Sequence, residues 1–177
     1  MKKHSTCQIV DVTRFALVAK IGEDISVRRF ERVESPGLLG SYLHGTRIGT
    51  LVAIEGGDAQ LARDLAMHVA ASNPAFLSAA DVPEEAKAKE RAIRIEIMKN
   101  DEKNRGKPEN ILVKIVEGGM SKWLGEITLL GQPFVKDDKL SIEKLLAGAK
   151  ARVLRFARLE VGAGIEKKQD DFVAEVM

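Results

Sequence analysis

The stretch LLGSYLHGTRIGTLVAIEGGDAQLARDLAMHVAASNP, residues 38–74, decides the fold. It begins with two apolar-rich runs, Leu38–Tyr42 and Arg47–Ile54, separated by His44-Gly45-Thr46. Glycine adopts the backbone conformations that tight turns need, so this pair of runs predicts a β-hairpin.

A helix is expected directly after the hairpin. Asp58 is a suitable N-cap residue, because its carboxylate can accept a hydrogen bond from the first turn. Apolar residues then recur on one broad helical stripe as far as Ser72, and His68 lies on that stripe. We interpret His68 as a hydrogen-bonded histidine in or beside the core. Asn73-Pro74 ends the helix, because proline disfavours helical geometry in the preceding residue.

A second pattern, between residues 81 and 128, predicts a projecting arm. Residues 84–105 are dense in Glu, Lys and Arg, with an apolar stripe of Ala88, Ala92, Ile95 and Met98. Gly106-Lys107-Pro108 breaks this helix, and a second helix follows whose expected stripe is Ile111, Ile115, Met120, Trp123 and Ile127. Two such helices joined by a tight turn form an antiparallel helical hairpin of coiled-coil type. Within the second helix, Gly118-Gly119 marks a kink or a place of close packing.

The remaining segments complete an α+β fold: a small antiparallel sheet with packed helices, the inserted hairpin and a C-terminal helix. Phe15–Ile21 predicts the end of a helix that stops at Gly22, and Ile25–Val33 alternates like a strand. Ser141 can cap a short helix, and Ala151–Val161 reads as a strand. We divide the chain into an undetermined arm (1–15), a remnant of a first subdomain (16–35), a second subdomain in two parts (36–80 and 129–163), the helical hairpin (81–128) and a C-terminal module (164–177).

Composition limits the class of protein. The 177 residues are 45% hydrophobic and 31% charged, and 28 Lys plus Arg against 26 Asp plus Glu give a net charge of +2. Because the basic residues are interspersed with acids, we expect no direct nucleic-acid binding. No apolar run approaches the roughly 20 residues that span a membrane. The single cysteine, Cys7, allows no internal disulfide and favours a cytoplasmic protein.

No constellation of catalytic or metal-binding residues emerges from the sequence. His4, His44 and His68 lack the spacing of a metal site, and the glycines form no phosphate-binding motif. We therefore expect no metal, no cofactor and no enzymatic activity. From the residues alone, His44 is a solvated turn residue.

Several segments spread over the chain closely resemble the elongation factor Ts family. They are ALVAKIGEDISVRRF (16–30), GSYLHGTRIGTLVAIEGGD (40–58), LARDLAMHVAASNPAFLS (61–78), GKPENILVKIVEGGM (106–120), LLGQPFVKDD (129–138) and RLEVGAGIEKKQDDFVAEV (158–176). The resemblance implies two α+β subdomains, a coiled-coil hairpin inserted in the second, and a C-terminal helix. It also implies binding to the translational GTPase elongation factor Tu and faster release of GDP from it.

The resemblance also implies which residues contact the partner. These are Ile21 and Gly22, His44 in the hairpin turn, Val135 beside the LGQPF loop, and Phe172 and Val176 in the C-terminal helix. For His44 this implied role replaces the interpretation as a solvated turn residue.

Three departures from the family pattern affect the expected activity. The family's Thr-Asp-Phe motif, which is aimed at the magnesium site of the partner, does not occur in this sequence, nor does the family's N-terminal three-helix domain. Gly119 stands where arginine is usual. We therefore expect weakened exchange activity. The alternative is an interaction module that binds elongation factor Tu, or itself as a homodimer, without promoting exchange.

Overall fold

A computed structural model describes residues 4–23, 26–101 and 107–164, and for residues 4–9 it describes only the backbone. The chain divides into two units, Met1–Arg32 and Val33–Met177. The larger unit combines helices with a small antiparallel sheet, which confirms the predicted α+β class.

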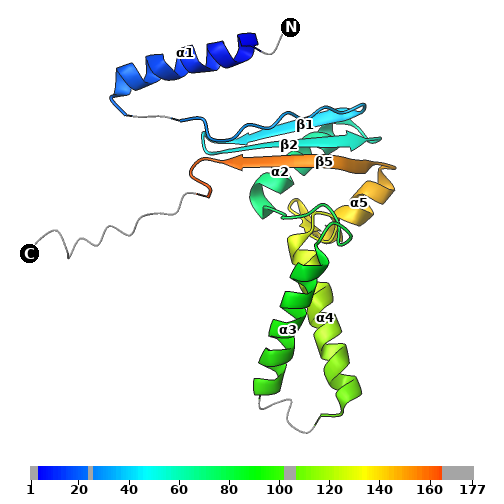
Figure 1. The fold of residues 1–177 in the computed structure, drawn as a ribbon. Coiled ribbons are helices and arrows are strands. Elements are labelled where there is room, and N and C mark those ends of the chain that lie inside the picture. The colour runs from blue at the N-terminus through cyan, green and yellow to red at the C-terminus, as the bar shows by residue number, and fades with distance from the viewer. Residues whose placement is uncertain (1–3, 24–25, 102–106, 165–177) are drawn as a thin grey trace, which may run out of the picture. The chain divides into compact units, whose positions relative to one another are not determined.

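The sheet has three antiparallel strands in the order β1-β2-β5 (Figure 1). The predicted hairpin consists of β1 (Leu38–His44) and β2 (Ile48–Glu55), with Gly45 at φ +57° in the turn. The third strand, β5 (Arg152–Glu160), arrives from far along the chain and pairs with β2. β1 and β5 are therefore the two edges of the sheet.

Helix α2 (Ala59–Ser72) covers one face of this sheet (Figure 1). Its predicted caps are present: the Asp58 side chain accepts a hydrogen bond from the Leu61 N–H at 2.7 Å. At the other end, Asn73 adopts a left-handed conformation with φ +46° and donates to the Val69 carbonyl, which closes the last turn. Gly40 of β1 lies directly beneath the helix, where a Cβ atom would collide with the Ala62 carbonyl.

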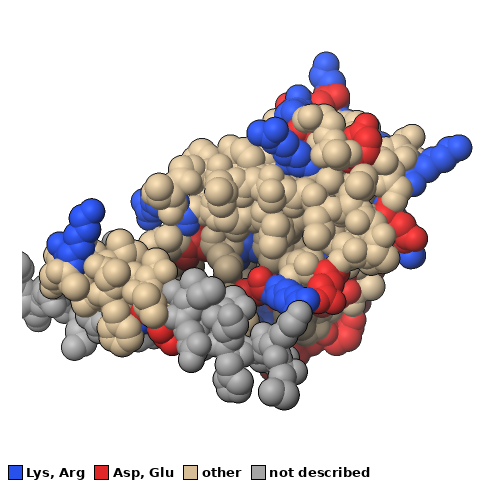
Figure 2. All heavy atoms as spheres, turned by 90° about the horizontal axis from the view of Figure 1, so that it is seen from above, with Lys and Arg blue, Asp and Glu red and all other residues tan. Residues whose placement is uncertain are grey.

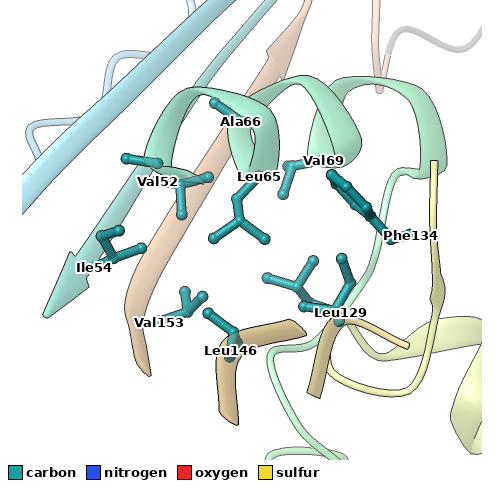
Figure 3. Close-up of a cluster of buried hydrophobic side chains, with 11 residues drawn as sticks. Val52, Ile54, Leu65, Ala66, Val69, Leu129, Phe134, Leu146 and Val153 are labelled. Atoms are coloured by element: carbon teal, nitrogen blue, oxygen red, sulfur yellow. The ribbon is translucent and has the colours of Figure 1, made fainter. Parts of the chain in front are cut away.

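The hydrophobic core lies between α2, the sheet and the segments that follow the arm. Figure 3 shows its side chains converging from β2, α2, β5 and α5. Apolar burial of this kind stabilises a fold by about 25 cal/mol per Å². The cluster consists of Val52, Ile54, Ala62, Leu65, Ala66, Val69, Leu129, Phe134, Ile142, Leu146 and Val153.

The arm consists of α3 (Glu84–Asn100) and α4 (Glu109–Ile127), which diverge as they leave the body (Figure 1). Its base is closed by backbone hydrogen bonds: the N–H groups of Ala75 and Phe76 donate to the Ile127 carbonyl at 2.9 and 3.1 Å. The two ends of the arm therefore lie side by side. The helical hairpin is present as predicted, whereas supercoiling of its helices stays a prediction.

The stripe predicted for α4 is partly wrong. Its buried side chains are Val116 and Met120, while Ile111 and Ile115 are exposed. The i, i+4 spacing of the two isoleucines is helical, but both side chains lie outside the buried row, and Ile115 lines a surface pocket together with Ile97 and Met98 of α3. Sequence periodicity gives the presence of a stripe more reliably than its direction.

The stripe predicted for α3 is also partly wrong. Ala88 and Ala92 are exposed, and only Ile95 and Met98 of the predicted stripe are half-buried. Gly119 is a place of close packing, because a Cβ atom there would lie 2.8 Å from the Arg94 guanidinium. The Arg94 side chain thus occupies the space beside Gly119.

The chain returns from the arm through two short strands, β3 (Pro133–Phe134) and β4 (Asp137–Ser141), which pair with each other. Helix α5 (Ile142–Gly148) follows and begins as predicted, with the Ser141 side chain accepting a hydrogen bond from the Lys144 N–H at 3.4 Å. Ile142 and Leu146 of this helix enter the core.

The smaller unit contains α1 (His4–Ile21), which extends into the residues left undetermined by the sequence. The predicted stop at Gly22 is confirmed, with φ +74° and a hydrogen bond from its N–H to the Val18 carbonyl. The strand predicted for Ile25–Val33 is wrong over the described part, because residues 26–35 form no regular element. Phe30 is 88% exposed, and an alternating pattern without a partner strand is not stable on its own.

Candidate protein-binding surface

The six residues implied as partner contacts fall in three groups. Ile21 and Gly22 belong to the smaller unit, His44 and Val135 to the larger one, and Phe172 and Val176 lie outside the described residues. No spatial relation between the first two groups follows from this division.

Ile21 is the last residue of α1, and its side chain is exposed. The positive φ of Gly22 ends the helix and turns the chain there. A Cβ atom at Gly22 would meet no other atom within 4 Å, so the conformation of this glycine, and not close packing, explains its use. The pair therefore presents an exposed apolar side chain at a sharply defined helix end.

His44 ends β1 at the edge of the sheet and is exposed. Its Nδ1 atom lies 3.5 Å from the Tyr42 hydroxyl, and the two ring centroids are 6.3 Å apart. The hairpin pairing holds the backbone of both residues, so the imidazole stands on a rigid element. This position agrees with both interpretations of His44, as a solvated residue and as a contact residue.

Val135 lies in the turn between β3 and β4, and its side chain is 48% exposed. Its neighbour Phe134 is only 7% exposed and packs in the core, with its ring centroid 6.2 Å from that of His68. Successive side chains of an extended segment point in opposite directions. Burial of Phe134 thus turns Val135 outward.

A hydrogen-bond cluster around His68 holds this turn in place. His68 is fully buried, and its Nδ1 atom accepts a hydrogen bond from the Val135 N–H at 3.3 Å. The opposite nitrogen, Nε2, lies 3.0 Å from Oε1 of buried Gln132. Gln132 in turn donates through Nε2 to the Glu126 carbonyl at 2.6 Å. The buried histidine therefore ties α2, the base of the arm and the Val135 turn together.

These contacts assign the tautomer of His68. Because Nδ1 accepts from a backbone N–H, the proton resides on Nε2 and is donated to Gln132. Burial lowers the pKa of His68 below its usual 6.5, and the hydrogen bond to Gln132 raises it by a smaller amount. The neutral ring is thus the form that fits the site, as the sequence interpretation of a hydrogen-bonded core histidine requires.

The partners of His68 could not be named from the sequence. Gln132 and Val135 lie 64 and 67 positions further along the chain. The only local signal was a histidine on an apolar helical stripe, which indicates burial and leaves its partners open.

The surface carries no strong electrostatic signature in the view of Figure 2, where acidic and basic side chains lie next to one another and neither sign covers a continuous area. Among the described residues, no group of three or more His, Cys, Asp or Glu could hold a metal ion. No helix in the described ranges is long and apolar enough to cross a membrane.

Comparison with known proteins identifies the family. The family model described as "Elongation factor TS" matches residues 2–163. The chain belongs to the elongation factor Ts family. The match begins well before Ala16, so the residues that precede the quoted segments, and with them most of α1, also follow the elongation factor Ts pattern.

Individual elongation factor Ts proteins are more than half identical to the chain. The protein from Thioalkalivibrio sulfidiphilus is 53% identical over 170 residues, which cover 95% of this chain and 57% of the relative. That from Methylococcus capsulatus is 54% identical over 169 residues, covering 95% and 56%. That from Alkalilimnicola ehrlichii is 54% identical over 162 residues, covering 91% and 54%. The chain thus spans a little over half the length of these elongation factor Ts proteins.

Proposed function

We propose that the chain binds the translational GTPase elongation factor Tu and promotes the release of GDP from it. The observation that carries this proposal is the Val135 turn, an exposed valine held on a buried framework by His68. A contact that is already ordered before association loses little conformational entropy on binding. His44, on the paired end of β1, is presented in a comparably rigid way.

Exchange by such a factor is a shift of populations. The factor must bind the nucleotide-free conformation of elongation factor Tu more tightly than the GDP-bound one. GDP and the factor then weaken each other's binding by the same ratio. Contacts that are equal in both conformations give affinity but no exchange.

A binding experiment tests the association with elongation factor Tu. We expect the two proteins to co-elute in size-exclusion chromatography without nucleotide and to separate on addition of GDP. Val135→Asp should weaken the complex at least about tenfold, because it places a charge in a partly buried apolar contact. Val113→Asp is the matched control, since Val113 of α4 is 49% exposed and lies on the arm. Separate elution of the unmodified proteins at tens of micromolar concentration (a binding free energy below about 7 kcal/mol) contradicts the proposal.

The second candidate function is an interaction module without exchange activity, which binds elongation factor Tu or a second copy of the chain. The sequence observation in its favour is that no Thr-Asp-Phe motif occurs in the 177 residues. Stopped-flow release of a fluorescent GDP analogue separates the two functions. We expect stimulation at least about tenfold weaker than that of a full-length factor, or about 1.4 kcal/mol of lost differential binding. Binding with no stimulation at saturation establishes the second function instead.

A further inference from the structure

The outer edge of β1 lacks the usual protection of an edge strand. β1 pairs with β2 on one side, and no hydrogen bond to its other side is found within the described ranges. Alternate residues of such a strand direct their N–H and C=O groups away from the sheet. Edge strands are usually protected by charged residues or proline. The opposite edge, β5, carries three arginines and a glutamate, whereas LLGSYLH of β1 carries no proline, lysine, arginine, aspartate or glutamate.

A groove of about 520 Å³ runs along this unprotected edge. One side is β1, including Gly40, Ser41 and Tyr42, and the other is the first half of α2, with Ala59 and Arg63. The absence of a side chain at Gly40 lets the helix backbone approach the strand closely. The helix therefore forms a wall directly beside the free backbone groups.

The side chains around the groove differ between the two faces of the sheet. Gly40 faces α2, so Leu39 and Leu43 point to the opposite face, where they are 50% and 76% exposed. On the α2 face, Arg63 is exposed and forms no ion pair with any other described residue. A strand laid along β1 would direct its side chains alternately toward the leucines and toward the guanidinium.

We propose that this groove binds an extended peptide segment of a partner protein, which adds a fourth strand to the sheet through β1 and in which apolar and acidic residues alternate. Only another extended backbone matches the row of free N–H and C=O groups. The apolar residues pack on Leu39 and Leu43, and the acidic residues pair with Arg63. Neither Val135 nor His44 lines the groove, although His44 ends the same strand, so the peptide is titrated in the absence of elongation factor Tu.

A second copy of the chain fits the same edge less well. If two β1 strands paired around a two-fold axis perpendicular to the sheet, the two α2 helices would lie on the same face. Arg63 of each copy would then approach the seam, where like charges repel each other. A peptide that brings its own carboxylates removes this repulsion.

The probe is a fluorescein-labelled peptide in which valine and glutamate alternate over seven positions, titrated with the full chain. We expect saturable binding, visible as increased fluorescence polarisation, and at least about fivefold weaker binding of the peptide with lysine in place of glutamate. Arg63→Glu should reverse this preference. Arg91→Glu, an exposed arginine on α3, is the matched control and should leave it unchanged.

Two further measurements distinguish strand addition from general charge attraction. Two versions of the Val/Glu peptide are N-methylated, one at the odd positions and one at the even positions, so that each lacks the N–H donors of one edge of the strand. The affinity of one version should fall at least about tenfold, because it lacks the donors that face β1. In ¹⁵N spectra of the protein, the amides of residues 38–44 should shift on binding. Retained binding of both methylated peptides, equal affinity for the Val/Glu and Val/Lys peptides, or no saturation up to about 1 mM protein overturns the proposal. If the chain dimerises without peptide and the same amide signals shift as it does so, a second copy occupies the edge of β1, and this result also overturns the proposal.

Discussion

Replacing the buried histidine, His68→Leu, should destabilise the larger unit and remove part of its pH dependence. The substitution leaves Gln132 Oε1 without the donor that lies 3.0 Å away and the Val135 N–H without its acceptor at 3.3 Å. A buried polar group that loses its partner costs about 1–3 kcal/mol, and Val135 is only partly buried. Improved burial of the leucine offsets part of this cost, so we expect a net loss of about 2–4 kcal/mol.

Urea unfolding followed by circular dichroism measures this loss. With a urea dependence of about 2 kcal/mol per M, the midpoint should fall by about 1–2 M. His44→Leu is the matched control, because His44 is exposed and its removal leaves no buried group without a partner. A midpoint for His68→Leu equal to or above that of the unmodified chain would refute the reasoning.

The pH dependence tests the same contacts by a second route. Since the pKa of His68 is lowered in the folded protein, the unfolded chain binds the proton more readily. Folding stability contributed by His68 is therefore fully present above its usual pKa of 6.5 and is lost as the pH falls from there toward the folded pKa. The slope is at most about 1.4 kcal/mol per pH unit.

The lower end of the pH range for this measurement takes account of two carboxylates with lowered pKa values, those of Asp81 and Glu84. Hydrogen bonds from Ser78 lower the pKa of Asp81 below 3.8, and Lys87 lowers that of Glu84 below 4.5. Measurements between about pH 7.5 and 5 therefore stay above the range in which these two carboxylates titrate. His68→Leu should lack the loss of stability in that range, whereas His44→Leu should retain it. Equal slopes for His68→Leu and the unmodified chain would show that His68 is not the group responsible.

Three further predictions concern the arm and two glycines. Replacing residues 84–127 by a short Gly/Ser linker should preserve cooperative thermal unfolding, because the N–H groups of Leu129 and Leu130 still donate to the Phe76 and Leu77 carbonyls at the base of the arm; a product without a thermal transition would show that the arm is part of the core. Gly118→Ala should raise the free energy of unfolding by up to about 1 kcal/mol in urea titration, since the added methyl meets nothing within 4 Å; a lowered midpoint would contradict this. Gly40→Ala should lower it by several kcal/mol, since the methyl collides with the Ala62 backbone, and unchanged stability would exclude the close approach of β1 and α2.

Local sequence signals determined most of the elements of this protein. Gly45 between two apolar runs predicted the hairpin, and Asp58 and Ser141 predicted the starts of α2 and α5. These signals work because a turn or a cap is decided by a few neighbouring residues, whose hydrogen bonds form within the element itself. Pro108 likewise precedes the first residue of α4, Glu109, whereas α3 ends at Asn100, before the predicted residue 105.

Tertiary structure decided what depends on partners that are distant in the sequence. Ile25–Val33 has the alternation of a strand, but its described residues, 26–33, form none, because a strand needs a neighbour with which to pair. Ile111 and Ile115 have helical spacing but are exposed, because the rotation of α4 is set by packing across the pair, which buries Val116 and Met120 instead. The hydrogen bonds of His68 join segments more than 60 positions apart, and the groove beside β1 exists only because α2 folds back over Gly40. The sequence by itself determined the hairpin, the helices of the arm and the capped helix starts, whereas pairing and packing between distant segments determined which strands are stable and which surfaces are presented.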